Sequence, residues 1–296
     1  MKKVFVKTLL LVFTSLIISC SSDDNSVPNG NGNEGGENNK KEIVVVKSMV
    51  HNYYSPDKKI VSSQNYTFKY DAENRVEKVN YETEYPSGPN ETKKFATETI
   101  YKYGKQNRLE SYKITSNEVY ANRDVNLVYD DKGKLTTIKS KSISHNGDTS
   151  LSLQYNAKEQ VERVELFVDG ISRQINKLKY QDNDLVEVIF GTDPDDIWSI
   201  EMNYNKEILN PFMNMAVQIL FNIYDGSLDE IDEFYKPKYV LSQIIDDGDY
   251  PAVFKYELYK DTKFPTKISK YFSEEEFKDK VEDEIIYTYE TLTLNK

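Results

Sequence analysis

Hydrophobic and polar residues alternate along most of the chain after residue 42, in segments separated by short polar turns. In YTFKY, which begins at Tyr66, aromatic residues alternate with Thr67 and Lys69. Successive side chains of a β-strand point to opposite faces of a sheet, so this alternation predicts a strand with one buried and one solvent-exposed face. The same pattern in residues 151–155, and the turns between such segments, predict antiparallel hairpins.

The hairpin pattern is repeated, and a tyrosine marks each copy. The clearest markers are Tyr70, Tyr103, Tyr129, Tyr155 and Tyr180. After each of the first four, apolar residues follow at six and at nine positions, with polar turns such as DAEN and DDKG before them. Asp, Asn and Gly favour such turns. From Tyr103 to Tyr204 the markers are 24 to 26 residues apart, which is about one hairpin per copy.

Fainter copies surround Tyr256 and Tyr289. About eight hairpins imply a dozen or more strands, and open sheets of more than ~10 strands curl or split. The sequence therefore predicts an all-β, mainly antiparallel fold in which repeated β-hairpins form a curled sheet or barrel.

Two segments depart from the repeat and predict helices. Between Tyr204 and Tyr256 the marker spacing doubles to 52 residues. In this gap the apolar residues of NMAVQILFNI follow helical spacing, which predicts a short helical insertion around 211–235. The capping-box pattern of SEEEFKDKVEDE predicts a short helix around 274–283. We expect the insertion to plug or cap the curled sheet.

The amino-terminal residues predict export and a lipid anchor. Residues 1–19 combine a lysine-rich start with the apolar run TLLLVFTSLIIS, as in a secretory signal peptide. The order SLIISC, in which Ser19 precedes the only cysteine, Cys20, resembles a bacterial lipobox. The resemblance implies cleavage between Ser19 and Cys20, and acyl chains on Cys20 that hold the protein to a membrane. An ordinary signal peptide with a coincidental cysteine is the alternative.

The residues after the cysteine predict a tether. Ser21, Ser22, Asp23 and Asp24 resemble the acidic export signal of Bacteroidota-type surface lipoproteins. The Gly/Asn/Glu-rich stretch that follows, up to residue 41, cannot bury enough apolar surface to fold. We therefore expect three parts, which are a signal peptide (1–19), a lipidated amino terminus with a disordered tether (20–41) and a single β-hairpin-repeat domain (42–296).

Charge narrows the range of partners. The chain carries 38 Lys and Arg against 49 Asp and Glu, a formal charge of -11, and loss of residues 1–19 with their three lysines makes it -14. Nucleic acids and anionic lipid surfaces are bound mainly through Lys and Arg, so the sequence argues against both.

The lipobox, the repeated hairpins of the form Y-D-x-x-x-[RKV]-[LV] and the NPF-type insertion together resemble the Bacteroidota-type lipoprotein family of unknown function with a porin-like fold. The hairpins also resemble, more distantly, the tyrosine-aspartate repeats of Rhs-type surface proteins. The Asp of that repeat is absent at Gly104, Asn156 and Gln181. A barrel that spans the membrane is a further alternative, but the charges of Glu162 and Arg163 fall on both faces of one predicted strand, which argues against it.

Candidate site residues are few. The two histidines, His51 and His145, lie in polar stretches and are predicted to be on the surface. Weak calcium candidates occur in two acidic turns, and they are Asp193, Asp195, Asp196, Asp246, Asp247 and Asp249. Ordinary turn residues are the simpler interpretation, since the spacing of a calcium-binding loop is absent. Trp198 is a weak candidate for binding a sugar ring, although it too fits a core position.

These observations predict a lipid-anchored cell-envelope lipoprotein that acts as a non-catalytic binding or structural module. We expect it at the outer membrane, exposed on the cell surface rather than facing the periplasm. A glycan or an envelope protein is the expected partner, without a cofactor. The alternative is a carboxylate-dependent hydrolase of an envelope or extracellular glycan, with Asp195 and Asp247 as candidate acids.

Overall fold

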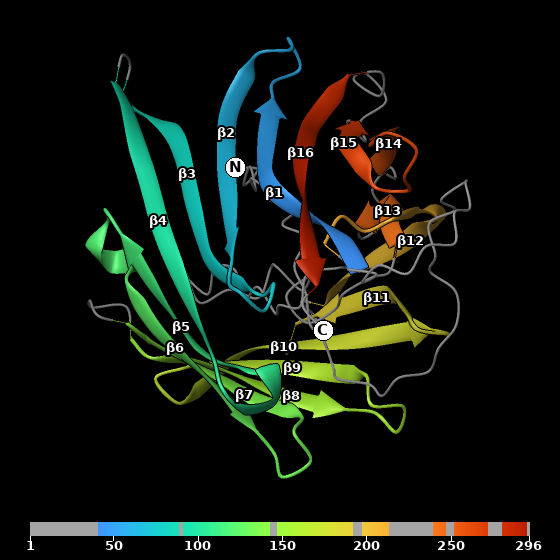
Figure 1. Cartoon of the computed structure of the whole chain (residues 1–296). Helices are drawn as coiled ribbons and strands as arrows, with labels where there is room; N and C mark the ends of the chain where they lie inside the picture. Colours follow the sequence, from blue (N-terminus) through green and yellow to red (C-terminus); the bar gives the residue numbers. More distant parts are fainter. Residues whose placement is uncertain are drawn as a thin grey trace, which may run out of the picture.

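The protein is a closed antiparallel β-barrel of sixteen strands, in which each strand pairs with its neighbours in sequence and the first strand pairs with the last (Figure 1). The structure is a computed structural model that describes residues 41–88, 91–142, 147–191, 197–212, 239–246, 252–271 and 280–294. The sequence predicted an antiparallel arrangement of hairpins that forms either a curled sheet or a barrel. The structure confirms the barrel.

The strands follow one another around the barrel in chain order. They are β1 (Lys41–Tyr54), β2 (Ile60–Tyr70), β3 (Val76–Gly88), β4 (Glu91–Tyr103), β5 (Leu109–Ser116), β6 (Arg123–Tyr129), β7 (Leu135–Ser142), β8 (Thr149–Tyr155), β9 (Val161–Val168), β10 (Ile171–Gln181), β11 (Asp184–Phe190), β12 (Trp198–Leu209), β13 (Tyr239–Asp246), β14 (Ala252–Leu258), β15 (Pro265–Tyr271) and β16 (Val281–Leu294). Two short 3-10 helices, η1 (Lys105–Asn107) and η2 (Val119–Ala121), lie between strands.

A β-bulge explains the repeated spacing of six and nine residues. In a regular strand, the residues six and eight positions after the marker tyrosine would point to the same face. The second buried residue lies nine positions after the marker, so the strand must contain one extra residue between the two buried ones. After the marker Tyr70, Val76 pairs with Tyr70 and Lys78 pairs with Lys69, which leaves Glu77 as the extra residue. Equivalent register shifts occur at the markers of β4, β6, β8 and β10. Each bulge increases the local twist, which helps so large a sheet to curl and close.

Aspartate or asparagine side chains close the turns that follow the markers. In residues 130–134, the Oδ1 atom of Asp130 accepts hydrogen bonds from the backbone N–H groups of Lys132 and Lys134 at 3.0 and 2.8 Å. Gly133 adopts a φ of 82°, a left-handed angle that glycine accommodates without strain. Asp71 and Asn156 form the same pair of bonds in their own turns.

The marker tyrosines connect each hairpin to the strand that precedes it. The hydroxyl group of the marker at the end of one strand donates a hydrogen bond to a backbone carbonyl of the preceding strand. These bonds join Tyr70 to Val46, Tyr103 to Val76, Tyr129 to Leu109, Tyr155 to Leu135, Tyr180 to Val161, Tyr204 to Leu185 and Tyr289 to Pro265, at 2.5–2.9 Å. We call the barrel end that carries the turns 71–75, 104–108, 130–134 and 156–160 the tyrosine end. The opposite end, which carries the connections 55–59 and 117–122, is the loop end.

The barrel interior is a packed core among the described residues. Tyr66, Phe68, Ile138 and Leu151 face inward and are at most 4% exposed. Burial raises the pKa of the marker tyrosines, for example to about 12 for Tyr155. Near the loop end the buried side chains become polar, and they include His51, Thr97, Thr99, Arg123, Ser140, Thr149, Asn176 and Asp283.

The structure tests part of the two helices predicted around 211–235 and 274–283. Of the insertion predicted around 211–235, only residues 211–212 lie in the described chain, where they form a turn, and the remainder lies outside it. The helix predicted around 274–283 is wrong at its end, because Val281, Glu282 and Asp283 belong to β16, in which Val281 pairs with β15 and Asp283 with both β1 and β15. The alternation of Asp283, Ile285 and Tyr287 on the inner face overrides the local helical pattern. The first described strand, β1, begins at Lys41.

Candidate binding surface

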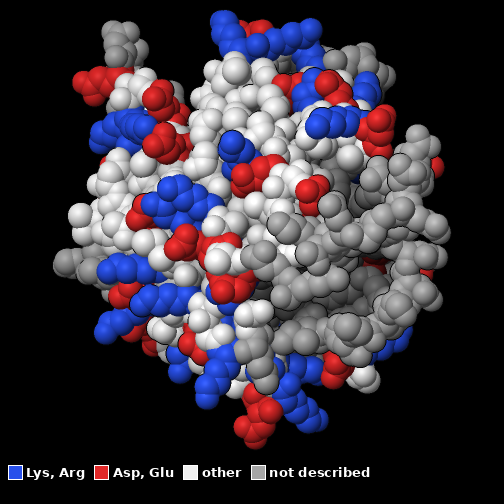
Figure 2. Space-filling model, viewed as in Figure 1, with Lys and Arg blue, Asp and Glu red and all other residues white. Residues whose placement is uncertain are grey.

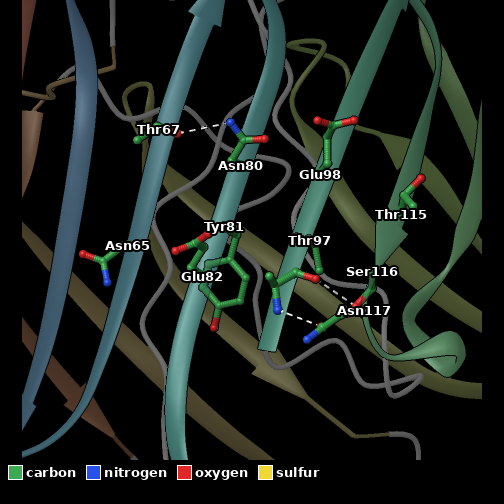
Figure 3. Close-up of a pocket in the computed structure, with 11 residues that line it drawn as sticks. Asn65, Thr67, Asn80, Tyr81, Glu82, Thr97, Glu98, Thr115, Ser116 and Asn117 are labelled. Atoms are coloured by element: carbon green, nitrogen blue, oxygen red, sulfur yellow. Dashed lines mark hydrogen bonds between the residues drawn. The ribbon is translucent and has the colours of Figure 1, made fainter. Parts of the chain in front are cut away.

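A groove with a volume of about 590 Å³ crosses β2, β3, β4 and β5 on the outer face of the barrel (Figure 3). Its floor consists of two adjacent rows of four residues, one residue from each strand. The rows are Thr67, Asn80, Glu98 and Thr115, and Asn65, Glu82, Ala96 and Asn117. Strand alternation places these eight residues, the groove floor, opposite the inward-facing Tyr66 and Phe68.

Charged residues occupy most positions of the two rows beside the groove floor. Towards the tyrosine end, the adjacent row is Lys69, Lys78, Ile100 and Lys113. Towards the loop end, it is Ser63, Glu84 and Lys94.

Both carboxylates of the groove floor are ion-paired. The ammonium group of Lys94 lies 2.7 Å from Glu82, and that of Lys78 contacts Glu98. Asn80 donates a 3.3 Å hydrogen bond to Thr67. Within the described residues, the side chains of Asn65 and Thr115 are exposed and have no hydrogen-bond partner. The groove thus offers amide and hydroxyl groups between charges that already balance each other.

Asn117 shapes the loop-end corner of the groove floor. Its Oδ1 atom accepts a hydrogen bond from the backbone N–H group of Ala96 at 2.9 Å (Figure 3). Its Nδ2 group donates a hydrogen bond to the carbonyl of Lys94 at 2.7 Å. Asn117 therefore continues the pairing of β5 with β4 by one residue after β5 ends at Ser116.

A second polar group lies inside the barrel, at the junction of β1 and β16. The Nε2 atom of His51 is 3.2 Å from Oδ1 of Asp283, and the hydroxyl group of Tyr53 is 3.0 Å from its Nδ1 atom. Lys270, from β15, approaches the second oxygen of Asp283 at 3.9 Å. His51 is 0% exposed, so the surface position predicted for it is wrong. The buried pair joins side chains of the first and the last strand.

The predicted site residues are placed as follows. Trp198 begins β12 and stacks on Phe190, with ring centroids 3.8 Å apart and an interplanar angle of 3°, so one face of its indole ring is covered. Asp246 ends β13, where its backbone pairs with Ile200. The residues that lie outside the described chain are Ser19, Cys20, Ser21, Ser22, Asp23, Asp24, His145, Asp193, Asp195, Asp196, Asp247 and Asp249.

Two features were missed by sequence reasoning. His51 continues the inward alternation of Met49 and Tyr53, and this signal could have identified it as buried. The groove floor gave no comparable signal, because Asn and Thr at outward positions are ordinary for a solvent-exposed sheet face. Only the register between four strands shows that the short side chains lie side by side.

The described residues contain no group of three or more His, Cys, Asp or Glu side chains placed to hold a metal ion. Nor does any described helix have the length and apolar character needed to cross a membrane. On the face shown in Figure 2, basic and acidic side chains are interspersed from one end of the barrel to the other.

The barrel is similar to a solved structure. A porin-like protein from Bacteroides uniformis aligns with a TM-score of 0.57 and 15% identity, over 83% of this chain and 98% of that one. A Tc holotoxin pore from Photorhabdus luminescens aligns over 72% of this chain and 13% of that one at 9% identity, but the TM-score of 0.19 is too low to indicate a shared fold. No protein-family profile and no curated protein matches the sequence. The class of protein is therefore a closed, porin-like β-barrel, and the similarity extends to the fold alone.

Proposed function

We propose that the protein is a lipid-anchored lipoprotein of the cell envelope, exposed at the outer membrane, whose barrel acts as a non-catalytic binding module. The observation that carries the proposal is the distribution of side chains in the barrel. Most buried side chains of the described interior are apolar or aromatic, and the outer face of the described strands carries charges such as Lys78, Glu98 and Lys179.

This distribution is opposite to that of a barrel that spans a membrane. Such a barrel presents an apolar band to lipid and a polar interior to water. A barrel with a charged outer face needs another means of attachment to the membrane, and the lipobox cysteine Cys20 followed by a flexible tether would supply it. Because β1 begins at the tyrosine end, the tether would reach the barrel there and leave the loop end pointing away from the membrane.

The groove supports binding rather than hydrolysis. Hydrolysis of a glycan needs a pair of carboxyl groups placed to act on the scissile bond. The two carboxylates of the groove floor, Glu82 and Glu98, are instead each held in an ion pair, with Lys94 and Lys78. The acids suggested for the hydrolase alternative, Asp195 and Asp247, lie outside the described residues.

Lipid attachment is tested in cells that express the full chain. A Cys20→Ser variant should lose incorporation of an alkyne-labelled fatty acid and leave the membrane fraction, whereas a Ser21→Ala control should keep both properties. Unlabelled Cys20→Ser protein that stayed in salt-washed membranes would mean that the barrel itself inserts, and the proposal would be rejected. Protease added to intact cells should digest the wild-type protein if it is exposed on the surface.

A further inference from the structure

We propose that the groove across β2–β5 is a saccharide-binding site that takes a short, neutral stretch of a glycan chain laid across the strands. The inference rests on the proposed binding function and names its ligand class. The groove volume, about 590 Å³, lies within the range of about 300–1,000 Å³ usual for ligand sites.

The chemistry of the groove floor suits a ligand rich in hydroxyl groups. Side-chain amides and hydroxyls both donate and accept hydrogen bonds, as sugar hydroxyls do. Asn65 and Thr115, at opposite corners of the groove floor, have no hydrogen-bond partner among the described residues and are exposed to an incoming ligand. Asn80, between them, makes only the long bond to Thr67. The ion pairs of Glu82 and Glu98 leave further acceptor oxygens without adding net charge to the groove.

Other macromolecules fit the groove less well. A peptide that binds by strand addition needs an exposed sheet edge, and every described strand of this closed barrel is paired on both sides. A peptide held by side-chain anchors needs apolar pockets, but among the residues that line the groove only Tyr81 and Ala96 have apolar side chains, and the others are Asn, Thr, Ser or Glu. The acidic chain as a whole opposes a nucleic acid.

The arrangement of the groove floor also predicts the length of the ligand. Neighbouring strands lie about 4.8 Å apart, so four strands span about 14 Å between the outer two. The length that one pyranose ring adds to a glycan chain is similar to the distance between two neighbouring strands. Each strand, with its two residues in the groove floor, would then contact about one ring, and a chain of about four rings would fill the groove.

The test uses the full-length protein in detergent, with oligosaccharides of two, four and six rings from glucan, mannan, xylan, chitin and peptidoglycan. Isothermal titration should show binding of at least one series, with affinity that increases by about tenfold from two to four rings and then levels off. Ala96→Tyr, which fills the groove floor, and Asn80→Ala should each weaken that binding by about tenfold or more. Asn126→Ala, on the outer face of β6 and outside the groove, is the matched control and should bind as the wild type does.

The results of this test separate the saccharide site in the groove from the binding function proposed for the whole protein. Binding that survives both Ala96→Tyr and Asn80→Ala would place the ligand elsewhere and overturn the groove, while a binding function remained. Absence of binding to all five series would overturn the saccharide assignment, and crosslinking to envelope proteins would then decide whether the protein binds any partner. A variant that weakens binding must keep the wild-type melting temperature, since loss of fold would otherwise explain the result. Release of reducing sugar from any bound series would contradict the non-catalytic assignment.

Discussion

The two ends of the barrel are built in different ways. At the tyrosine end, one arrangement is repeated, with a marker tyrosine bonded to a carbonyl, a bulge and a turn closed by Asp or Asn. At the loop end, the buried side chains are polar and each contact occurs once, as in the pair of His51 and Asp283. The tyrosine end is therefore held by one repeated set of contacts, whereas the loop end is held by contacts that each occur once.

Basic residues of the turns extend this repetition from one hairpin to the next. The guanidinium group of Arg75 lies 4.4 Å from the ring centroid of Tyr103, in the following copy, and the ammonium group of Lys134 lies 5.0 Å from that of Tyr155. Lys134 also pairs with Glu159, in the next turn, at 3.0 Å. Neighbouring copies at the tyrosine end therefore contact one another through cation–π and ion-pair contacts, each worth about 0.5–1 kcal/mol at an exposed site.

High pH should disrupt the tyrosine end and, with it, the whole barrel. Burial raises the pKa of Tyr129 and Tyr155 to about 12, against 10.0 for an unburied tyrosine. The unfolded chain therefore loses these protons first, so stability is unaffected below about pH 10 and falls as the pH rises towards 12. We expect cooperative unfolding in this interval, followed by circular dichroism and by tyrosinate absorbance. If both tyrosines ionised near pH 10 while the barrel stayed intact, the packing inferred for this end would be wrong.

The largest single-residue effect is expected at the loop end. Asp283→Ala removes the partner of the buried His51 and one contact of Lys270, and a buried polar group left without its partner typically costs about 1–3 kcal/mol. Urea unfolding should show a loss of about 2 kcal/mol in the free energy of unfolding. Asp261→Ala, at an exposed turn position, is the control and should change it by less than about 0.5 kcal/mol. Equal stabilities of the two variants would show that the pair does not hold the β1–β16 junction.

The sequence predicted the tyrosine end better than the loop end. Alternation and the marker tyrosines were sufficient to predict antiparallel hairpins, because each signal is local and occurs several times. The pairing of Glu82 with Ala96, and hence the groove, depends on register between strands, which no local pattern specifies. The 281–283 segment was assigned to a helix because its local propensity was weighed without the inward alternation that continues to Tyr287.

The smallest expected change in the free energy of unfolding distinguishes two tyrosines of the same repeat. Tyr155 donates a 2.7 Å hydrogen bond to the carbonyl of Leu135, whereas the buried hydroxyl of Tyr256 has no partner in the described chain. Tyr155→Phe should therefore cost about 1 kcal/mol, the usual net contribution of such a bond. Tyr256→Phe should be neutral or slightly stabilising, since it removes a buried polar group that gains nothing from the fold. Equal losses in urea unfolding would mean that ring packing alone, and not the bond to the carbonyl, makes the marker tyrosines important.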